Sequence, residues 1–159
     1  MIKATQNNWL KDLVIIVLIF LISFSAVKSL LQLGWFQTHD GDFHVAHLYW
    51  FDKTVRQGHF PVRWVEELNR GRAYPFFNFY YPLLYLLAEI PYFLGLPLVE
   101  ALKVTLAITF PLSGTFAYLW IKQLFGRLAG VAAAVLLMYA PYRFVAVYVT
   151  ARLGETVAL

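Results

Sequence analysis

An unbroken apolar run near the N-terminus constrains this chain more than any other feature. Leu13 to Val27 reads LVIIVLIFLISFSAV without a charged residue, and after Lys28 the apolar character continues to Phe36. This length matches the roughly 20 residues that an α-helix needs to cross a lipid bilayer. It is too long for a signal-peptide core, and no cleavage site of small residues follows. We therefore predict a membrane-spanning helix over residues 13–33.

Composition supports the same class for the whole chain. The 159 residues are 60% hydrophobic and 14% charged, whereas a soluble domain is about half apolar and about a quarter charged. Two further apolar segments predict spans over residues 101–124 and 128–149. The sequence thus predicts an all-α integral membrane protein: a helical bundle of about three transmembrane helices with juxtamembrane helices in the first loop, forming one membrane domain over residues 1–159.

The remaining composition excludes some classes of site. Cysteine is absent, so neither a disulfide framework nor a thiolate metal site can form. The net charge of +4 fits the flanks of membrane helices and contact with anionic headgroups, and we expect no nucleic acid partner.

The loop over residues 34–99 holds most of the acids and all four histidines. Between residues 43 and 57 an apolar stripe recurs at steps of three and four, which predicts an amphipathic helix along the membrane interface. The apolar stripe consists of Val45, Leu48, Phe51 and Val55. Another, polar face of the helix carries Asp52, Lys53 and Arg56. A second juxtamembrane helix is expected near 82–96. It is not expected to cross, because Glu89, Pro91, Gly95 and Pro97 interrupt a short apolar run.

Acids and histidines gather at the start of this loop. They are His39, Asp40, Asp42, His44 and His47. A carboxylate placed just after a membrane helix can act as a general base or hold a divalent cation, for which Asp40, Asp42 and His44 would be the ligands. Aspartate is also a common N-cap residue, so Asp40 or Asp42 could simply cap the following helix. These alternatives stay open at the level of sequence.

Two other sets of residues are candidates for binding. Arginine side chains suit phosphate or pyrophosphate groups, although ordinary headgroup contact is an alternative for each; the set is Arg56, Arg63, Arg70 and Arg72. The aromatic run from Tyr74 to Tyr81 could line a groove for a lipid chain or sugar, or form an interfacial belt. Arg152 and Glu155 are ionisable groups next to apolar segments, which makes them functional candidates.

The order of these motifs resembles a known family. His-Asp-x-x-Phe-His from His39 is followed by Gly-His-Phe-Pro-Val-Arg-Trp from Gly58, and then by a segment running from Tyr74-Pro75 to Tyr81-Pro82-Leu83. This pattern is similar to that of bacterial membrane proteins labelled as related to pyruvoyl-tetrahydropterin synthase. More broadly, it resembles the N-terminal part of GT-C membrane glycosyltransferases. One departure is Asp-Gly-Asp at residues 40–42 in place of the usual Asp-Glu pair.

The resemblance implies a reaction and a set of residues. A sugar would pass from a polyprenyl-phosphate donor to an acceptor, with Asp40 and then Asp42 as the catalytic acids. His44, Arg63, Arg70, Arg72, Tyr80, Arg152 and Glu155 would contact substrates, and a divalent cation is the cofactor to test for.

The resemblance also implies a location and further partners. We expect a multi-pass protein of the bacterial cytoplasmic membrane with a cytoplasmic N-terminus. Its partners would be the bilayer, the lipid-linked donor and the remainder of a longer chain, since the superfamily has more spans than this sequence. The alternative function is a non-catalytic membrane component for assembly or lipid binding.

Overall fold

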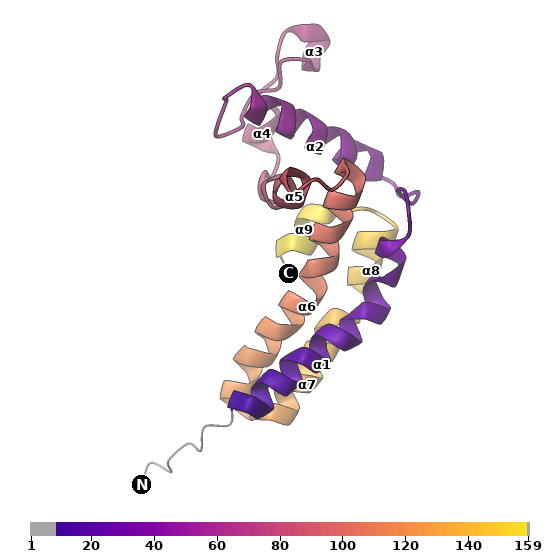
Figure 1. The fold of residues 1–159 in the computed structure, drawn as a ribbon, viewed down its shortest axis with the longest axis vertical. Helices are drawn as coiled ribbons and strands as arrows, with labels where there is room; N and C mark the ends of the chain where they lie inside the picture. Colours follow the sequence, from indigo (N-terminus) through magenta and orange to yellow (C-terminus); the bar gives the residue numbers. More distant parts are fainter. Residues whose placement is uncertain (1–8, 159) are drawn as a thin grey trace. The chain divides into compact units, whose positions relative to one another are not determined.

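The computed structural model describes residues 9–158 and is built from helices (Figure 1). Within these residues no strand forms, and Val65 and Tyr74 make one isolated antiparallel bridge. The elements are α1 (Trp9–Val27), η1 (Lys28–Leu31), α2 (Gly41–Arg56), α3 (Leu68–Gly71), α4 (Phe76–Phe79), α5 (Leu83–Phe93), α6 (Leu98–Phe125), α7 (Arg127–Met138), α8 (Pro141–Tyr148) and α9 (Leu153–Ala158). The expected all-α class is confirmed.

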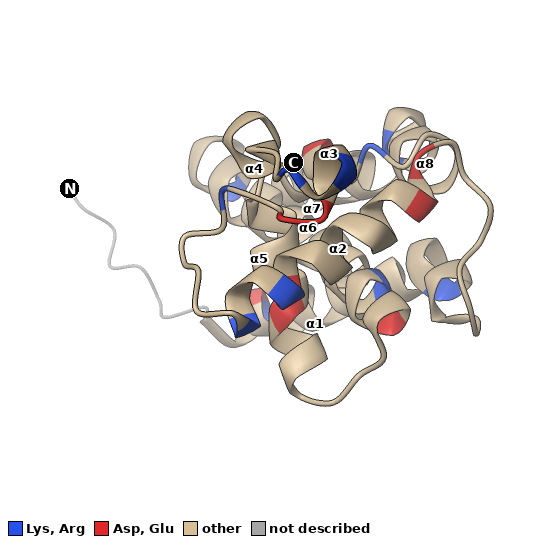
Figure 2. Ribbon diagram, turned by 90° about the horizontal axis from the view of Figure 1, so that it is seen from above, with Lys and Arg blue, Asp and Glu red and all other residues tan. Residues whose placement is uncertain are grey.

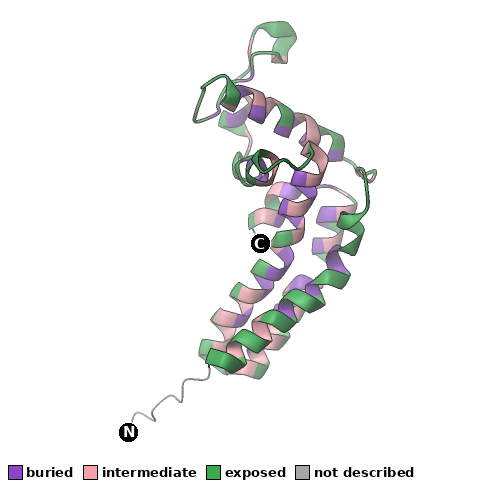
Figure 3. Cartoon of the chain, in the orientation of Figure 1, coloured by how far each residue is buried: buried purple, intermediate pink, exposed green. Residues whose placement is uncertain are grey.

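Three helical segments are long and apolar enough to cross a membrane. They are Trp9–Leu31, Leu98–Phe125 and Arg127–Tyr148. Charged residues are few, so most of the ribbon in Figure 2 is tan. α1 lies mainly in the exposed class in Figure 3, yet its exposed residues are apolar, Leu21 at 65% exposure among them. An apolar exposed face suits contact with lipid tails better than contact with water.

Two compact units share the chain: Met1–Ser29 with Phe110–Ala140, and Leu30–Thr109 with Pro141–Leu159. In the first unit, the core contains Ile19, Tyr118, Ala134 and Met138. Gly130 lies against Tyr118, where an added Cβ would come within 2.9 Å of the Tyr118 carbonyl oxygen. A small residue of α7 therefore allows close approach to α6 here.

The second unit holds the loop between the first two spans. Its central packing brings α2 against α5, and α9 against both α5 and α8. Lys103 is 3% exposed and anchors the chain that follows the first span, because its ammonium group donates to the carbonyl oxygens of Gln32 and Gly34. α5 has 11 residues and falls short of the length that a span needs.

Helix α2 forms where the amphipathic helix was predicted, near residues 43–57, but its buried face is wider than predicted. Leu48 and Phe51 are buried as expected, while Val45 and Val55 are half-buried. Asp52 was assigned to the polar face, and that assignment was wrong: its residue exposure is 6%. It lies on the face toward α5, where Arg56 pairs with it through a 2.6 Å contact between Nε and Oδ1.

Candidate functional site

Asp40 and Asp42 both lie at the exposed N-terminal end of α2. Asp40 occupies the N-cap position, but its side chain makes no capping hydrogen bond. Asp42 borders a hollow of about 510 Å³ whose other walls are largely apolar, Val45 and Leu98 among them. Both carboxylates are therefore accessible to a ligand from outside the protein.

The chain between α8 and α9 is bonded directly to this end of α2. The backbone N–H of His39 donates to the carbonyl oxygen of Val149 at 3.0 Å. The His44 ring nitrogen Nε2 lies 2.7 Å from the carbonyl oxygen of Ala151, which has a left-handed φ of 55°. These bonds bring residues more than 100 positions apart in sequence onto one surface.

Arg152 and Glu155 join the surface through this connection. Their nearest charged atoms lie 3.9 Å apart, and Tyr142 donates its hydroxyl hydrogen to the Glu155 carboxylate. The pKa of Arg152 is raised, first by the hydrogen bond with Tyr142 and then by the charge of Glu155, with a smaller contribution from Asp40. Asp40 therefore lies within electrostatic range of Arg152, although no hydrogen bond or ion pair joins these two described residues.

Beneath the acids, two buried histidines share one tyrosine hydroxyl. Tyr85 Oη lies 2.8 Å from His44 Nδ1 and 3.1 Å from His47 Nδ1. Because the Ala151 carbonyl can only accept, His44 Nε2 carries the hydrogen and Nδ1 of the neutral ring accepts from Tyr85. The Tyr85 oxygen then accepts from His47 Nδ1–H. The chain of bonds fixes one tautomer for each neutral ring.

Burial keeps this group of three side chains uncharged. Desolvation lowers the pKa of His44. Desolvation, with a smaller effect from the nearby His44, lowers the pKa of His47 to about 4. Desolvation also raises the pKa of Tyr85. His44 was predicted as a metal or substrate ligand; in the structure its two ring nitrogens are already engaged and its exposure is 1%. It positions the surface above it.

The aromatic run forms part of the same unit. Tyr80 stacks on Phe76 with ring centroids 4.8 Å apart and meets the His47 ring edge-on at 5.0 Å. Tyr81 lies against Gly154 of α9, where an added Cβ would fall 2.2 Å from the ring. The run from Tyr74 to Tyr81 thus packs around the histidines and α9. Tyr80 lies near the surface described above.

Three of the predicted phosphate ligands lie elsewhere on the chain. Arg63 belongs to the segment between α2 and α3, Arg70 to α3, and Arg72 follows it. All three are exposed, and among the residues described their side chains make no hydrogen bond or ion pair. The structure therefore places Asp40 and Asp42 at the end of α2, with Arg152 within electrostatic range of Asp40 and Glu155 next to Arg152. Tyr80 packs on the histidines instead, and the three arginines lie apart.

A metal site is not formed by the predicted ligands. Over residues 9–158, no group of three or more histidine or acidic side chains is close enough to hold an ion. Asp40 and Asp42 are exposed while His44 is buried. Two carboxylates two positions apart supply too few ligands for a divalent cation bound by protein alone.

Two carboxyl groups lie together between α2 and α5; Glu89 was a candidate from the sequence, but its pairing with Asp52 was not predicted. Glu89 is 4% exposed and has Asp52 as its neighbour. Burial, followed by the nearby Asp52, raises the pKa of Glu89 to about 7, against a smaller opposing effect of Arg56. The guanidinium of Arg56 lies over the rings of Tyr92 and Phe93 at 5.7 and 5.4 Å from their centroids. The position of Glu89 inside an apolar run was the available signal.

Comparison with known proteins found no family model, curated protein or solved structure that matches this chain.

Proposed function

We propose that this chain is the acid-bearing segment of a membrane glycosyltransferase that moves a sugar from a polyprenyl-phosphate donor to an acceptor hydroxyl. The observation that supports it best is the exposed, uncapped Asp40 carboxylate within electrostatic range of Arg152, with Glu155 3.9 Å from the Arg152 guanidinium. Enzymes that break a bond to phosphate need a base for the attacking group and a cation for the leaving group. This surface offers both, next to segments that can lie in a bilayer.

The reaction needs a distinct role from each group. The Asp40 carboxylate accepts the proton of the acceptor hydroxyl as its oxygen attacks the anomeric carbon. The bond from that carbon to the phosphate oxygen breaks, and the polyprenyl phosphate departs with the bonding electron pair. Arg152 stabilises the charge that develops on the phosphate, as a guanidinium does through paired N–H groups. Glu155 orients Arg152, and Tyr80 bounds the site. No metal ion is assigned to these steps.

Asp42 has a supporting role in this scheme. It lies two positions beyond Asp40 and borders the apolar hollow of about 510 Å³. That hollow suits the first isoprene units of the donor, since apolar walls favour a hydrocarbon chain over water. The same hollow also favours the second candidate function, a component that binds a lipid-linked sugar without transferring it.

Substitution of the two acids separates these possibilities. Asp40→Asn retains size and removes the basic carboxylate, so transfer in the full-length protein should fall by about 10²-fold or more. Asp42→Asn should reduce it less. The measurement is release of polyprenyl phosphate from a labelled donor in proteoliposomes, with protein amounts matched.

The remaining outcomes decide between the candidates. An inactive Asp42→Asn beside a normal Asp40→Asn would move the base two residues along. Normal transfer by both variants would refute the catalytic role of this surface. Donor binding without transfer by the wild-type protein would establish the non-catalytic component instead.

A further inference from the structure

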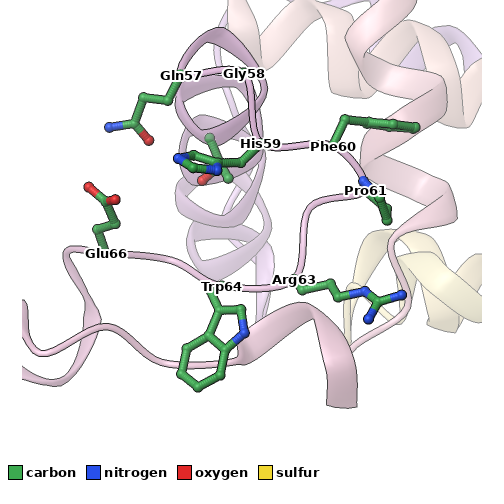
Figure 4. Close-up of a pocket in the computed structure, with 9 residues that line it drawn as sticks. Gln57, Gly58, His59, Phe60, Pro61, Arg63, Trp64 and Glu66 are labelled. Atoms are coloured by element: carbon green, nitrogen blue, oxygen red, sulfur yellow. The ribbon is translucent and has the colours of Figure 1, made fainter.

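A second hollow lies at the far end of α2 from the two acids (Figure 4). Its volume is about 450 Å³, within the range of about 300–1,000 Å³ typical of small-molecule sites. Its walls combine aromatic rings with hydrogen-bonding groups, and the side chains that matter are Gln57, His59, Phe60, Arg63, Trp64 and Glu66. The reaction proposed above uses none of them.

Backbone bonds hold both walls of this hollow in place. On one side α2 closes with Gly58 N–H donating to the Val55 carbonyl at 2.9 Å, and His59 N–H to the Thr54 carbonyl at 3.2 Å. On the other side Val65 pairs with Tyr74, and the Arg63 carbonyl accepts from Phe77 N–H at 3.1 Å. The side chains around the hollow therefore project from a fixed frame.

Alternation along the second wall decides which side chains reach the hollow. Val62 and Val65 are buried at 4% and 0% exposure, and they anchor the segment to the core. The residues between and after them, Arg63, Trp64 and Glu66, are exposed. Two buried valines three positions apart thus anchor the loop and leave the side chains around them accessible to a ligand.

The polar groups of the hollow have no partners of their own. Among the described residues, the side chains of Gln57, His59, Arg63 and Glu66 make no hydrogen bond or ion pair. Figure 4 shows the ends of Gln57 and Glu66 turned toward one another from the two walls, with the His59 ring beside them. Trp64 is 54% exposed and Phe60 is 68% exposed.

We propose that this hollow binds a saccharide. Sugar hydroxyls both donate and accept, and they match a site that sets the amide of Gln57 opposite the carboxylate of Glu66 and has the guanidinium of Arg63 elsewhere on its lining. The single positive and single negative side chain balance, which suits a neutral ligand better than a phosphate. Indole rings offer an apolar face for the C–H groups of a pyranose. This site goes beyond the transfer reaction and does not depend on Asp40.

The test is binding of neutral sugars to the protein in lipid nanodiscs, where no sugar-based detergent can occupy the hollow. The probes are maltose, lactose and the disaccharide of N-acetylglucosamine, measured by saturation-transfer difference NMR. At least one should bind with a Kd of about 1 mM or tighter. Trp64→Ala should weaken it about tenfold or more, and Glu66→Gln should weaken it several-fold.

Trp120→Ala is the matched control, because Trp120 on α6 is 68% exposed and lies outside the hollow. It should leave the affinity unchanged. An equal loss with Trp120→Ala, no binding by any of the three sugars, or displacement of the bound sugar by inorganic phosphate would overturn the proposal. Asp40→Asn should also leave binding unchanged, so failure of the transfer reaction and failure of this site are separate results.

A glycolipid arm identifies the source of the sugar. Monoglucosyl diacylglycerol is included in the nanodisc bilayer and compared with plain phosphatidylcholine. If the glycolipid competes with the soluble disaccharide, and this competition is lost in Trp64→Ala, the hollow binds a lipid-borne sugar headgroup. Soluble binding unaffected by the glycolipid would assign it to a saccharide from the aqueous phase.

Discussion

Two acidic sites in this protein differ in how many hydrogen bonds and ion pairs their carboxylates make. In the unit formed by α1, α7 and the second part of α6, Asp12 accepts from the Tyr118 hydroxyl at 2.5 Å and from Arg127 Nε at 2.9 Å, and it pairs with Lys122 at 2.9 Å. In the other unit, Asp40 and Asp42 are exposed, and Asp40 forms no capping bond. An acid engaged by three donors holds helices together, whereas an acid left accessible is available to a substrate.

The comparison also separates the roles of their surroundings. The partners of Asp12 come from α6 and α7 and are all donors, so this carboxylate links both helices to the N-terminal end of α1. The surroundings of Asp40 are arranged through other groups, since the bonds of His39 and His44 to the α8–α9 chain fix the surface without using the carboxylate. Fixed surroundings with an unused charged group are the arrangement that catalysis needs.

The largest expected effect is an all-or-none result on topology. If Leu98–Phe125 crosses the membrane and α5 does not, Gln57 and Gln123 lie on opposite sides. The native chain has no cysteine, so Gln57→Cys and Gln123→Cys each report a single site. An impermeant maleimide should label only one of them in intact cells, and both after lysis. Labelling of both in intact cells would contradict the three-span arrangement.

The next effect compares the two acids directly. Asp12→Asn removes a charge that three donors share, and it should lower the Tm by about 5 °C, given the usual strength of hydrogen bonds to charged groups. Asp40→Asn should change the Tm by about 1 °C or less, as exposed substitutions do. Thermal unfolding in one detergent measures both. Equal losses would show that Asp40 is structural, and the contrast between the sites would fail.

How much the sequence predicts differs between these sites. Apolar runs identified the spans, and the stripe of Leu48 and Phe51 identified α2, because both patterns are local. The burial of His44, His47 and Asp52 depends on α5 packing against α2, which no local pattern in α2 contains. The proximity of Arg152 to Asp40 depends on bonds between segments more than 100 residues apart. The ion pairs of Asp12 are likewise invisible in the sequence near it, since its three partners lie on α6 and α7.

A smaller effect is expected at Gly41, between the two exposed acids. A Cβ added there would lie 2.1 Å from Trp35 Nε1 and 2.2 Å from Thr38 Oγ1. Alanine gains at most about 1 kcal/mol in helix propensity, whereas overpacking typically costs about 1–3 kcal/mol. Gly41→Ala should therefore lower the Tm by a few degrees and shift the acids. Asp42→Ala, one position on and exposed, is the control, and a Gly41→Ala protein at least as stable as wild type would show that this packing is loose.

The last prediction concerns the pH dependence of a third kind of acid, which is buried but only partly compensated. Glu89 has an ordinary pKa of 4.5 and a folded-state pKa of about 7, because burial and the neighbouring Asp52 disfavour its charge. The folded protein thus binds this proton more tightly than the unfolded chain does. The contribution of Glu89 is fully present below pH 4.5, is lost as pH rises toward 7, and is constant above that. His47 acts oppositely, since its lowered pKa removes stability as pH falls from 6.5 toward 4.

The Glu89→Gln variant separates these two effects, because it removes only the acid. Relative to wild type, the variant should gain stability between pH 4.5 and 7 and keep a constant advantage above pH 7, while exposed Glu66→Gln should show no such trend. Thermal unfolding across this range measures the difference, and a Glu89→Gln curve parallel to that of wild type would mean that Glu89 is ionised in the folded protein and belongs with Asp12 among the fully stabilised acids.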